Sequence, residues 1–369
     1  MTKRPPTPKA NWEEIFSHLI PLWRRLHKLP SGPIDHLQTR EFRSLVEAVS
    51  SYPESKDFSD KNQLGAHLLY EWPLHLAQGL SLLQELPIKP QRVLDIGSGA
   101  APFAISALMY GATEAFAMDI SAPALKYAGE LAGLLGHPLS VREHDCKDLR
   151  KMPTQGRFDL IIVAYALDEM FSTLEAKLRY VRSLYGMLSE TGYLLLVDSS
   201  ENTKNKKMLE LRDALVKEHV RIQAPCIWKG LCPALDKGAP CYAQRPFEKP
   251  FMISEIQRSA KINLSSLKMS YLLFKHPSLP MLDTEERLYR IISPPIETFR
   301  GPRYFLCGVD GRKMLGSQLK EHPKQSRAYE YLKRGDAIAI QNPVEVGDDL
   351  QVAEDTTLVL KAPCDKPLI

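Results

Sequence analysis

The sequence predicts a doubly wound α/β fold, in which helices cover both faces of a mostly parallel sheet. Between residues 92 and 218, apolar strand patterns alternate five times with segments of helical periodicity. The first strand pattern runs into the glycine turn Asp95-Ile-Gly97-Ser-Gly99, a junction typical of nucleotide-binding α/β folds. With 369 residues, of which 44% are hydrophobic, the chain is long enough for this core and for two or three domains.

The individual elements follow from apolar spacing and from capping and turn residues. Asn11 is expected to cap the first helix. Helices are predicted at 12–27, 38–51, 63–83, 102–110, 121–135, 168–188 and 206–218. Strands are predicted at 92–96, 115–119, 139–144, 158–165 and 192–198, and a closing antiparallel pair at 219–224 and 267–274.

This order predicts three regions. Residues 1–85 form a helical N-terminal region, residues 86–280 the α/β domain, and residues 281–369 a small β-rich extension. Within the α/β domain, residues 224–262 are an insertion in the hairpin of the closing strands, and connections of that length are usually functional or disordered. The extension is predicted from four short strand patterns, at 304–309, 336–341, 349–352 and 357–360.

The carboxyl ends of the first three strands carry the residues expected to bind a nucleotide-like cofactor. Asp95 is placed to order the glycine turn, and Gly97 and Gly99 keep side chains away from the ligand. Asp119 ends the second strand, where a carboxylate pairs with a ribose diol. Asp145 follows the third strand and is expected beside an adenine ring.

Three further residues follow the fourth strand, at the expected mouth of the same pocket. Tyr165 is predicted to contact the cofactor, and Asp168 and Glu169 either position a substrate or cap the next helix. The loop, the spaced acid and the five-unit pattern resemble the seven-strand, Rossmann-like S-adenosylmethionine-dependent methyltransferases over residues 86–280. The alternative is a fold that has lost its cofactor. No catalytic residue is predicted, because the motifs for amine or pyrimidine methylation are missing after strand four.

Six cysteines in a chain of this length do not form a disulfide framework, and three of them crowd into one short segment. Cys226, Cys232 and Cys241 lie among prolines and glycines, and clustered thiols of this kind bind a soft metal or an iron–sulfur centre. The spacing is wrong for a zinc ribbon with two CxxC knuckles. A fourth ligand has to come from elsewhere in the chain, and the candidates are Cys307, Cys146 and Cys364.

The cysteine segments make a second resemblance specific. The motifs that carry it are Ala224-Pro-Cys226, Cys232-Pro233, Cys241-Tyr-Ala-Gln244-Arg245, Ser270-Tyr-Leu-Leu, Leu306-Cys307-Gly and Asp310-Gly311. They resemble, over about residues 90–340, the methyltransferase-like assembly factors of the mitochondrial small ribosomal subunit and their bacterial relatives. The resemblance implies a 4Fe–4S cluster held by Cys226, Cys232, Cys241 and Cys307. Zinc is the alternative, because four thiolates also suit Zn²⁺.

This resemblance implies a factor for small-ribosomal-subunit assembly that binds S-adenosylmethionine and the cluster and contacts ribosomal RNA and proteins. The alternative is an active methyltransferase, acting on ribosomal RNA or protein, whose metal is a structural zinc. The sequence does not decide whether methyl transfer takes place.

Charge and composition limit the partners and the compartment. A formal net charge of +4 permits a polyanionic partner, and basic residues gather near both sites. The expected contacts to RNA are Lys204, Lys206, Lys207, Arg245, Lys249, Lys320, Lys324, Arg327, Lys333 and Arg334, with Trp228, Tyr242 and Tyr329 as aromatic partners. The alternative is that these residues form solvated faces. No secretory signal or membrane span is predicted, and we expect a monomer in a bacterial-type cytoplasm rather than a mitochondrial matrix.

Overall fold

The structure is a computed structural model that describes residues 10–30, 37–51, 57–152, 156–280, 286–364 and 366. The chain divides into two compact units. Unit 1 comprises Met1–Leu83, Lys89–Met170 and Pro246–Leu267. Unit 2 comprises Gln84–Ile88, Phe171–Arg245 and Lys268–Ile369.

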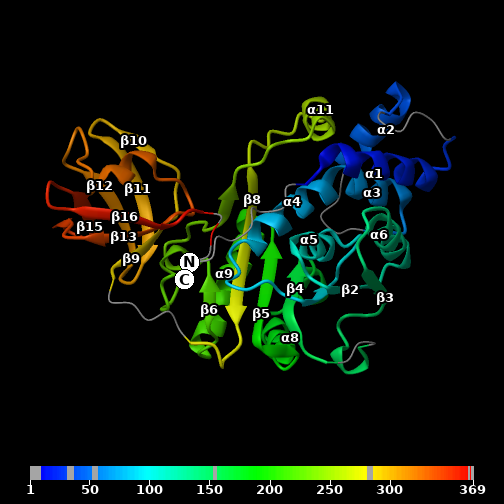
Figure 1. Cartoon of the computed structure of the whole chain (residues 1–369), viewed down its shortest axis with the longest axis horizontal. Coiled ribbons are helices and arrows are strands. Elements are labelled where there is room, and N and C mark those ends of the chain that lie inside the picture. The colour runs from blue at the N-terminus through cyan, green and yellow to red at the C-terminus, as the bar shows by residue number, and fades with distance from the viewer. Residues whose placement is uncertain are drawn as a thin grey trace. The chain divides into compact units, whose positions relative to one another are not determined.

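Unit 1 holds the N-terminal helices and the first half of the α/β pattern (Figure 1). As predicted, Asn11 caps the first helix, its side chain accepting a hydrogen bond from the backbone N–H of Glu14. The elements are α1 (Trp12–Leu26), α2 (Thr39–Ser50), α3 (Lys61–Ala66), the π-helical turn η1 (His67–Glu71), α4 (Trp72–Leu83), β1 (Arg92–Ile96), α5 (Pro102–Tyr110), β2 (Glu114–Asp119), α6 (Ala122–Leu134), β3 (Leu139–Glu143), the 3₁₀ turn η2 (Leu149–Lys151), β4 (Phe158–Ala164), α7 (Leu167–Met170) and α11 (Phe251–Ser259).

The strands of unit 1 lie in the order β3-β2-β1-β4 and are all parallel. Strand β1 is central, and its residues Val93, Leu94 and Ile96 are fully buried, as expected for a parallel strand covered on both faces. Because the strands are parallel, the carboxyl ends of β1, β2 and β4 meet at one edge of the sheet, where the predicted pocket residues lie.

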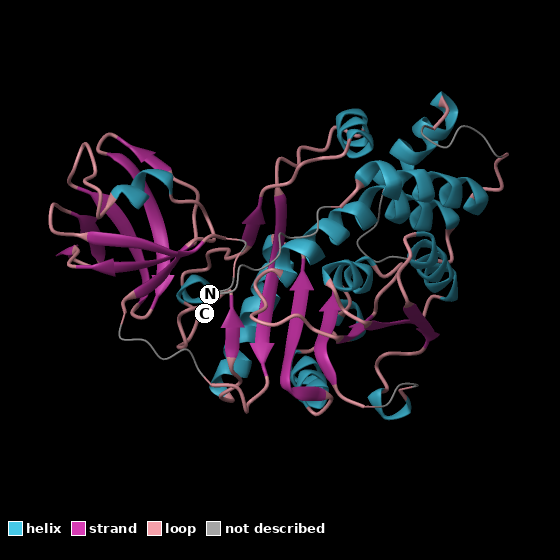
Figure 2. Ribbon diagram, in the orientation of Figure 1, coloured by secondary structure: helices cyan, strands magenta, loops and turns pink. Residues whose placement is uncertain are grey.

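Unit 2 holds the remaining α/β elements and a C-terminal region that consists almost wholly of strands, which form a second sheet (Figure 2). Its elements are α8 (Leu174–Tyr185), β5 (Leu188–Asp198), α9 (Asn202–Lys217), β6 (Ile222–Ala224), α10 (Pro233–Asp236), β7 (Ala243–Arg245), β8 (Leu267–Lys275), β9 (Leu288–Ile291), β10 (Ile296–Thr298), β11 (Gly301–Gly308), β12 (Gly311–Ser317), the 3₁₀ turn η3 (Arg327–Tyr331), β13 (Ala337–Gln341), β14 (Val344–Val346), β15 (Asp349–Val352) and β16 (Thr357–Ala362).

The closing strands behave as predicted, since β8 pairs antiparallel with both β5 and β6. The connection from β6 to β8 carries α10, β7 and α11, so the cysteine-rich segment is an insertion between closing strands. The C-terminal strands form a sheet in the order β14-β15-β12-β11-β9-β13-β16, with β10 paired to β11, around buried residues such as Tyr289 and Leu306. The predicted α/β class with a C-terminal β region is therefore confirmed.

One predicted helix is divided by a break in the structure. The helix expected over 168–188 is interrupted after α7, and α8 begins at Leu174, where the Thr173 hydroxyl accepts a hydrogen bond from the backbone N–H of Ala176. Leu188, the expected last residue of that helix, is the first residue of β5. A side-chain cap at Thr173 prevailed over apolar periodicity that continued across the break.

Two other predictions concern boundaries and termini. The three predicted regions, 1–85, 86–280 and 281–369, stay a prediction, and the boundary at 281 lies outside the described residues. The first nine residues, on which the prediction of no secretory signal depends, lie outside them as well. Among the residues placed in the structure, no helix is both long and apolar enough to cross a membrane.

Candidate functional site

A cavity of about 590 Å³ opens at the carboxyl edge of the parallel strands in unit 1. All six residues predicted to bind the cofactor line it, and they are Asp95, Gly97, Gly99, Asp119, Asp145 and Tyr165. Glu169 lines the cavity too, and Asp168 belongs to the first turn of α7. The sequence therefore identified residues that the fold brings to one place.

The glycine turn has a backbone that few other residues adopt. Gly97 and Gly99 have φ angles of +66° and +55°, a region that side chains disfavour. A Cβ atom on Gly97 would lie 2.4 Å from the Cβ of Ala166, and one on Gly99 would lie 3.1 Å from the ring of Phe58. Both glycines are thus required by the turn itself and by its close neighbours.

Two carboxylates hold this turn and the start of the following helix by accepting hydrogen bonds from backbone N–H groups. The Oδ2 atom of Asp95 accepts a hydrogen bond from the N–H of Ala104 at 2.9 Å, which ties β1 to α5. The Oδ2 atom of Asp119 accepts from the N–H of Gly99 at 2.7 Å, and its Oδ1 accepts from Ser121 at 2.8 Å. Burial raises the pKa of Asp95 to about 7, with the charge of Asp119 adding to the rise, and burial also raises the pKa of Asp119.

Tyr165 closes the cavity from the end of β4. It has a φ angle of +60°, and its hydroxyl donates to the Oε1 of Gln78 at 2.8 Å. Its ring stacks on the imidazole of His75, with centroids 4.3 Å apart and planes 16° from parallel. Asp145 accepts a hydrogen bond from the N–H of Lys147 at 3.1 Å at the end of β3. The helical N-terminal region therefore supplies part of this site.

One further observation indicates that the cavity fits a small polar cofactor. The Oδ1 atom of Asp95 and the hydroxyl of Ser98 are buried and have no hydrogen-bond partner among the described residues. Buried polar atoms are rarely left so unless a ligand or water meets them. Sequence reasoning missed Phe58, His67 and His75, which line the cavity from the helical region. A four-residue spacing of His67, Glu71 and His75 was the signal available for two of them.

The second candidate site is a pocket in unit 2 between the insertion, α9 and the C-terminal sheet. The four cysteines expected as ligands all line it, although Cys307 is separated from Cys241 by 66 positions. Of the two competing thiols, Cys146 lines the cavity of unit 1. Cys364 lies beside Gly335, and its N–H donates to the carboxylate of Asp336 at 2.9 Å.

Side chains of α9 hold two of the cysteine backbones in place. The amide of Asn205 donates to the carbonyl of Cys241 at 2.8 Å and accepts from its N–H at 3.0 Å. The carboxylate of Asp213 accepts the N–H of Cys232 at 2.9 Å. Because Asn205 is fully buried and also donates to Ser270, the loop of Cys241 is anchored to both α9 and β8.

Cationic side chains surround the thiols. The buried guanidinium of Arg212 donates to the carbonyls of Trp228 and Gly230 and pairs with Asp213. Arg290 on β9 donates to the carbonyl of Pro225 at 2.6 Å, which ties the C-terminal sheet to the residue preceding Cys226. Arg312 lines the pocket from β12, opposite Cys307 in the strand pair.

The thiols influence one another's ionisation, as expected of groups that share one pocket. Burial, and then the charges of Cys226 and Cys232, raise the pKa of Cys241 to about 12. Burial likewise raises the pKa of Cys232, and burial followed by the other three thiols raises that of Cys307. These three thiols are therefore harder to ionise than a thiol in water.

Four thiols that meet in one pocket suit two kinds of metal centre. A single zinc ion takes four thiolates at about 2.3 Å. A 4Fe–4S centre also takes four, one on each of its iron atoms. The described residues include one further group of possible metal ligands, His67, Glu71 and His75, whose ligand atoms all lie within 4.8 Å of one another.

Two of the residues expected to contact RNA are in the wrong place. Arg245 is buried and pairs with the carboxylate of Glu85, which also accepts a hydrogen bond from Tyr271. Tyr329 is fully buried in the core of the C-terminal sheet. Both predictions were based on residue type and on position in the sequence, and burial removes these side chains from solvent. Tyr331 is exposed instead, in the same turn.

The remaining basic residues of the C-terminal region lie at the surface. Lys320, Lys324, Arg327 and Lys333 are exposed around the turn η3. The guanidinium of Arg334 lies 4.0 Å above the ring of Tyr242, close in sequence to Cys241. These residues, with the exposed Tyr331, form the basic segment 320–334.

A family model described as the mitochondrial small ribosomal subunit Rsm22 matches residues 82–337. No curated protein sequence matches. Among solved structures, a ribosomal protein L11 methylase from Lactobacillus delbrueckii subsp. bulgaricus is 23% identical, with 42% of this chain and 70% of that chain covered and a TM-score of 0.31. An rRNA methylase from Streptococcus thermophilus is 10% identical, with 54% and 94% covered and a TM-score of 0.31. The plantazolicin methyltransferase BpumL with SAH is 13% identical, with 70% and 99% covered and a TM-score of 0.37.

Proposed function

We propose a function from one premise: the chain belongs to the family of the mitochondrial small ribosomal subunit protein Rsm22. We infer that it associates with the small ribosomal subunit as an assembly factor with a methyltransferase-like fold. In this proposal unit 1 binds S-adenosylmethionine, unit 2 binds a 4Fe–4S cluster, and basic side chains of unit 2 contact ribosomal RNA. The bacterial-type cytoplasm stays our proposal for its compartment, although the family is named for mitochondria.

The cofactor proposal for unit 1 rests on the cavity around the glycine turn. Asp119 would hold the ribose hydroxyls and Asp145 the side of the adenine ring. Asp95 and Ser98 present buried oxygen atoms without partners toward the same space. Bound S-adenosylmethionine would supply an electrophilic methyl group, and the residues of this cavity would orient that group and exclude water from it.

The observation that carries the proposal is the convergence of Cys226, Cys232, Cys241 and Cys307 on one pocket. Arg212 and Arg312 line the same pocket, where their charges would offset those of thiolates bound to iron. The centre would join the insertion to β11 of the C-terminal sheet. Its loss would loosen the surface that carries the basic segment, since ligation energy at such sites is part of folding energy.

Anaerobic purification followed by iron, sulfide and zinc analysis tests the metal. We expect at least four irons and four sulfides per chain, and a broad visible absorption that bleaches on reduction. Replacement of Cys307 by Ser should abolish this absorption, whereas Cys364→Ser should retain it. A colourless protein with one zinc per chain, under the same anaerobic conditions, would contradict the cluster.

Association with immature small subunits tests the role in assembly. Particles that co-purify with the protein at low salt should contain small-subunit ribosomal RNA. The double variant Lys324→Glu with Arg327→Glu should bind these particles more weakly, and its binding constant should fall less steeply with salt concentration. Lys126→Glu with Arg142→Glu, on exposed positions of unit 1, is the matched control. Equal loss in both double variants would show general electrostatics rather than a docking segment.

Labelled S-adenosylmethionine separates an assembly factor from an active methyltransferase. Binding without transfer to immature particles is expected for the proposed role. Sustained incorporation of the label into RNA or protein, abolished by Asp95→Ala, would establish the enzyme instead. Absence of binding in equilibrium dialysis would remove the cofactor from the proposal and leave the metal result untouched.

A further inference from the structure

His67, Glu71 and His75 recur at intervals of four residues along one continuous helical segment. The first two belong to the π-helical turn η1, and the third lies in α4. The N–H of Trp72 donates to the carbonyl of His67, five residues earlier, which defines the wider turn. Such π turns are rare and are often found at functional sites.

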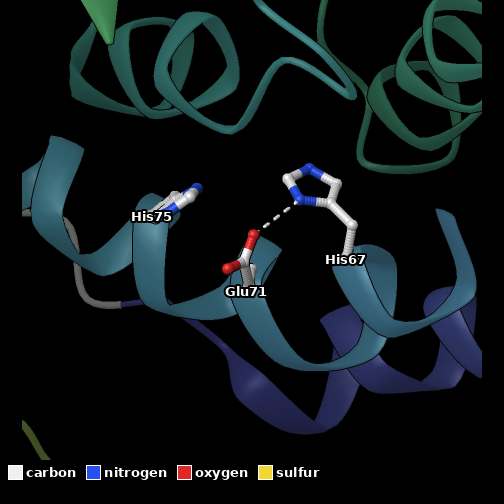
Figure 3. A group of neighbouring side chains, drawn as sticks. All are labelled: His67, Glu71 and His75. Atoms are coloured by element: carbon white, nitrogen blue, oxygen red, sulfur yellow. Dashed lines mark hydrogen bonds and ion pairs between the residues drawn. The ribbon is translucent and has the colours of Figure 1, made fainter. Parts of the chain in front are cut away.

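The wider turn gives the three side chains a common direction. In a regular α-helix, residues eight positions apart differ by roughly 80° around the axis. A turn with more residues per revolution reduces this divergence. Figure 3 shows the three side chains pointing to the same side of the helical segment, and their ligand atoms all lie within 4.8 Å of one another.

The local contacts suit metal coordination. The Nδ1 atom of His67 lies 3.3 Å from the Oε2 of Glu71, and both side chains are largely withdrawn from solvent. The stacking of His75 on Tyr165 occupies a face of the imidazole, whereas a metal binds in the ring plane at a nitrogen. The stacking contact therefore orients His75 through the face of its ring and not through its plane.

The surroundings favour a cation at this place. His67 and His75 line the cavity of unit 1, which also has the carboxylates of Asp95, Asp119 and Asp145 in its wall. A bound cation benefits from such negative charge in a partly dry site. Two imidazoles and one carboxylate form a donor set that suits Zn²⁺ or Fe²⁺ rather than Mg²⁺ or Ca²⁺.

We propose that His67, Glu71 and His75 bind a divalent transition-metal ion of the zinc or ferrous class at the wall of this cavity. Three protein ligands leave at least one coordination position for water or for a ligand oxygen or nitrogen in the cavity, as in open rather than purely structural sites. That this ligand is S-adenosylmethionine rests on the proposed function. Metal binding itself does not.

The difference in metal content between wild type and a variant tests the proposal independently of any metal that the cysteines bind. Wild-type protein and Glu71→Gln are dialysed against the same free Zn²⁺ concentration, and zinc is counted per chain. We expect one more equivalent in the wild type. The control is His322→Ala, because the Nδ1 of His322 lies 3.3 Å from the carboxylate of Glu330, the same separation as in the proposed site. This control should keep the wild-type count.

Cobalt substitution identifies the ligands of that extra ion. The difference spectrum between cobalt-loaded wild type and Glu71→Gln should show visible d–d bands without the near-ultraviolet band of sulfur-to-cobalt charge transfer. His75→Ala should lose the same bands. Should His75→Ala fail to fold, which circular dichroism would reveal, Glu71→Gln keeps the size of the side chain and decides. Equal metal counts in wild type and Glu71→Gln, or a difference spectrum with thiolate character, would overturn the site.

Discussion

The cavity of unit 1 and the cysteine pocket of unit 2 are constructed in opposite ways. The cavity takes its shape from one short backbone turn, whose amides are held by Asp95 and Asp119. The pocket takes its shape from side chains that come from separate segments, with Cys307 on β11 and the other three in the insertion. The first site is local in sequence and the second is not.

This difference teaches where each site obtains its stability. The backbone of the turn at Gly97 is held without a ligand, because the N–H of Ser98 donates to the carbonyl of Met118 and the N–H of Gly99 donates to the carboxylate of Asp119. In the pocket, burial and the neighbouring thiols raise the pKa of Cys241 and that of Cys307, and the proposed metal centre would offset this opposition to ionisation by binding the thiolates. We therefore expect the cofactor to be optional for the folding of unit 1 and the metal to be part of the folding of unit 2.

The largest effect should come from removing one metal ligand. We expect Cys241→Ser to lose the metal and much of the stability of unit 2, because structural metal sites contribute on the order of 10 kcal/mol in small domains. Cys364→Ser is the control outside the pocket, and thermal unfolding with metal analysis is the measurement. If Cys241→Ser unfolds at the same temperature as the control, the expected difference between the two sites is contradicted.

A second effect of several kcal/mol concerns the buried charges of unit 2. Arg245 and Glu85 form an ion pair in which both side chains are almost fully buried. Replacing Arg245 by Met leaves a buried carboxylate without its main partner, which typically lowers the free energy of unfolding by about 3–5 kcal/mol. Arg179→Met removes the exposed pair with Glu175 and should change it by less than about 1 kcal/mol. Denaturant unfolding measures both, and similar values for the two would show that the buried pair is not a special element of unit 2.

Sequence reasoning reached the local site more completely than the distributed one. The strand end, the glycines and Asp119 are fixed by spacing along the chain, so their meeting could be predicted from parallel strands alone. Three of the cysteines could be grouped from their closeness in the sequence, but the fourth could be chosen only through a family resemblance, because no spacing rule brings Cys307 to a loop 66 positions earlier.

Two kinds of residue escaped prediction for physical reasons. Arg212 and Asn205 support the pocket from α9, yet in sequence they are ordinary polar residues of a helix. Tyr329 and Arg245 have the types that contact RNA, but tertiary packing buries them. The π turn that aligns His67 and His75 depends on helix geometry around Trp72 and Pro73, which propensity does not reveal.

The next prediction concerns how the free energy of unfolding depends on pH through Asp95 of unit 1. Burial raises the pKa of Asp95 to about 7, so the folded chain keeps a proton that the unfolded chain releases above about pH 4. The free energy of unfolding therefore falls as pH rises from about 4 to about 7. Asp95→Asn keeps an acceptor for Ala104 and cannot ionise, so it should be more stable than the wild type at pH 7.5, by at most about 4 kcal/mol. Melting curves at several pH values measure this, and parallel pH profiles for the two proteins would contradict it.

The smallest effect separates strain in the turn from close packing around it. Gly97 and Gly136 both have positive φ angles, +66° and +72°, but a Cβ atom meets Ala166 at 2.4 Å only in the first case and open space in the second. Alanine at Gly136 should cost only the left-handed backbone, about 1 kcal/mol. Alanine at Gly97 should cost about 1–3 kcal/mol more, because Ala166 must move, and should weaken S-adenosylmethionine binding. Denaturant unfolding and equilibrium dialysis measure the pair. Equal losses would mean that the turn tolerates a side chain, and the shape of the cavity would then not depend on Gly97.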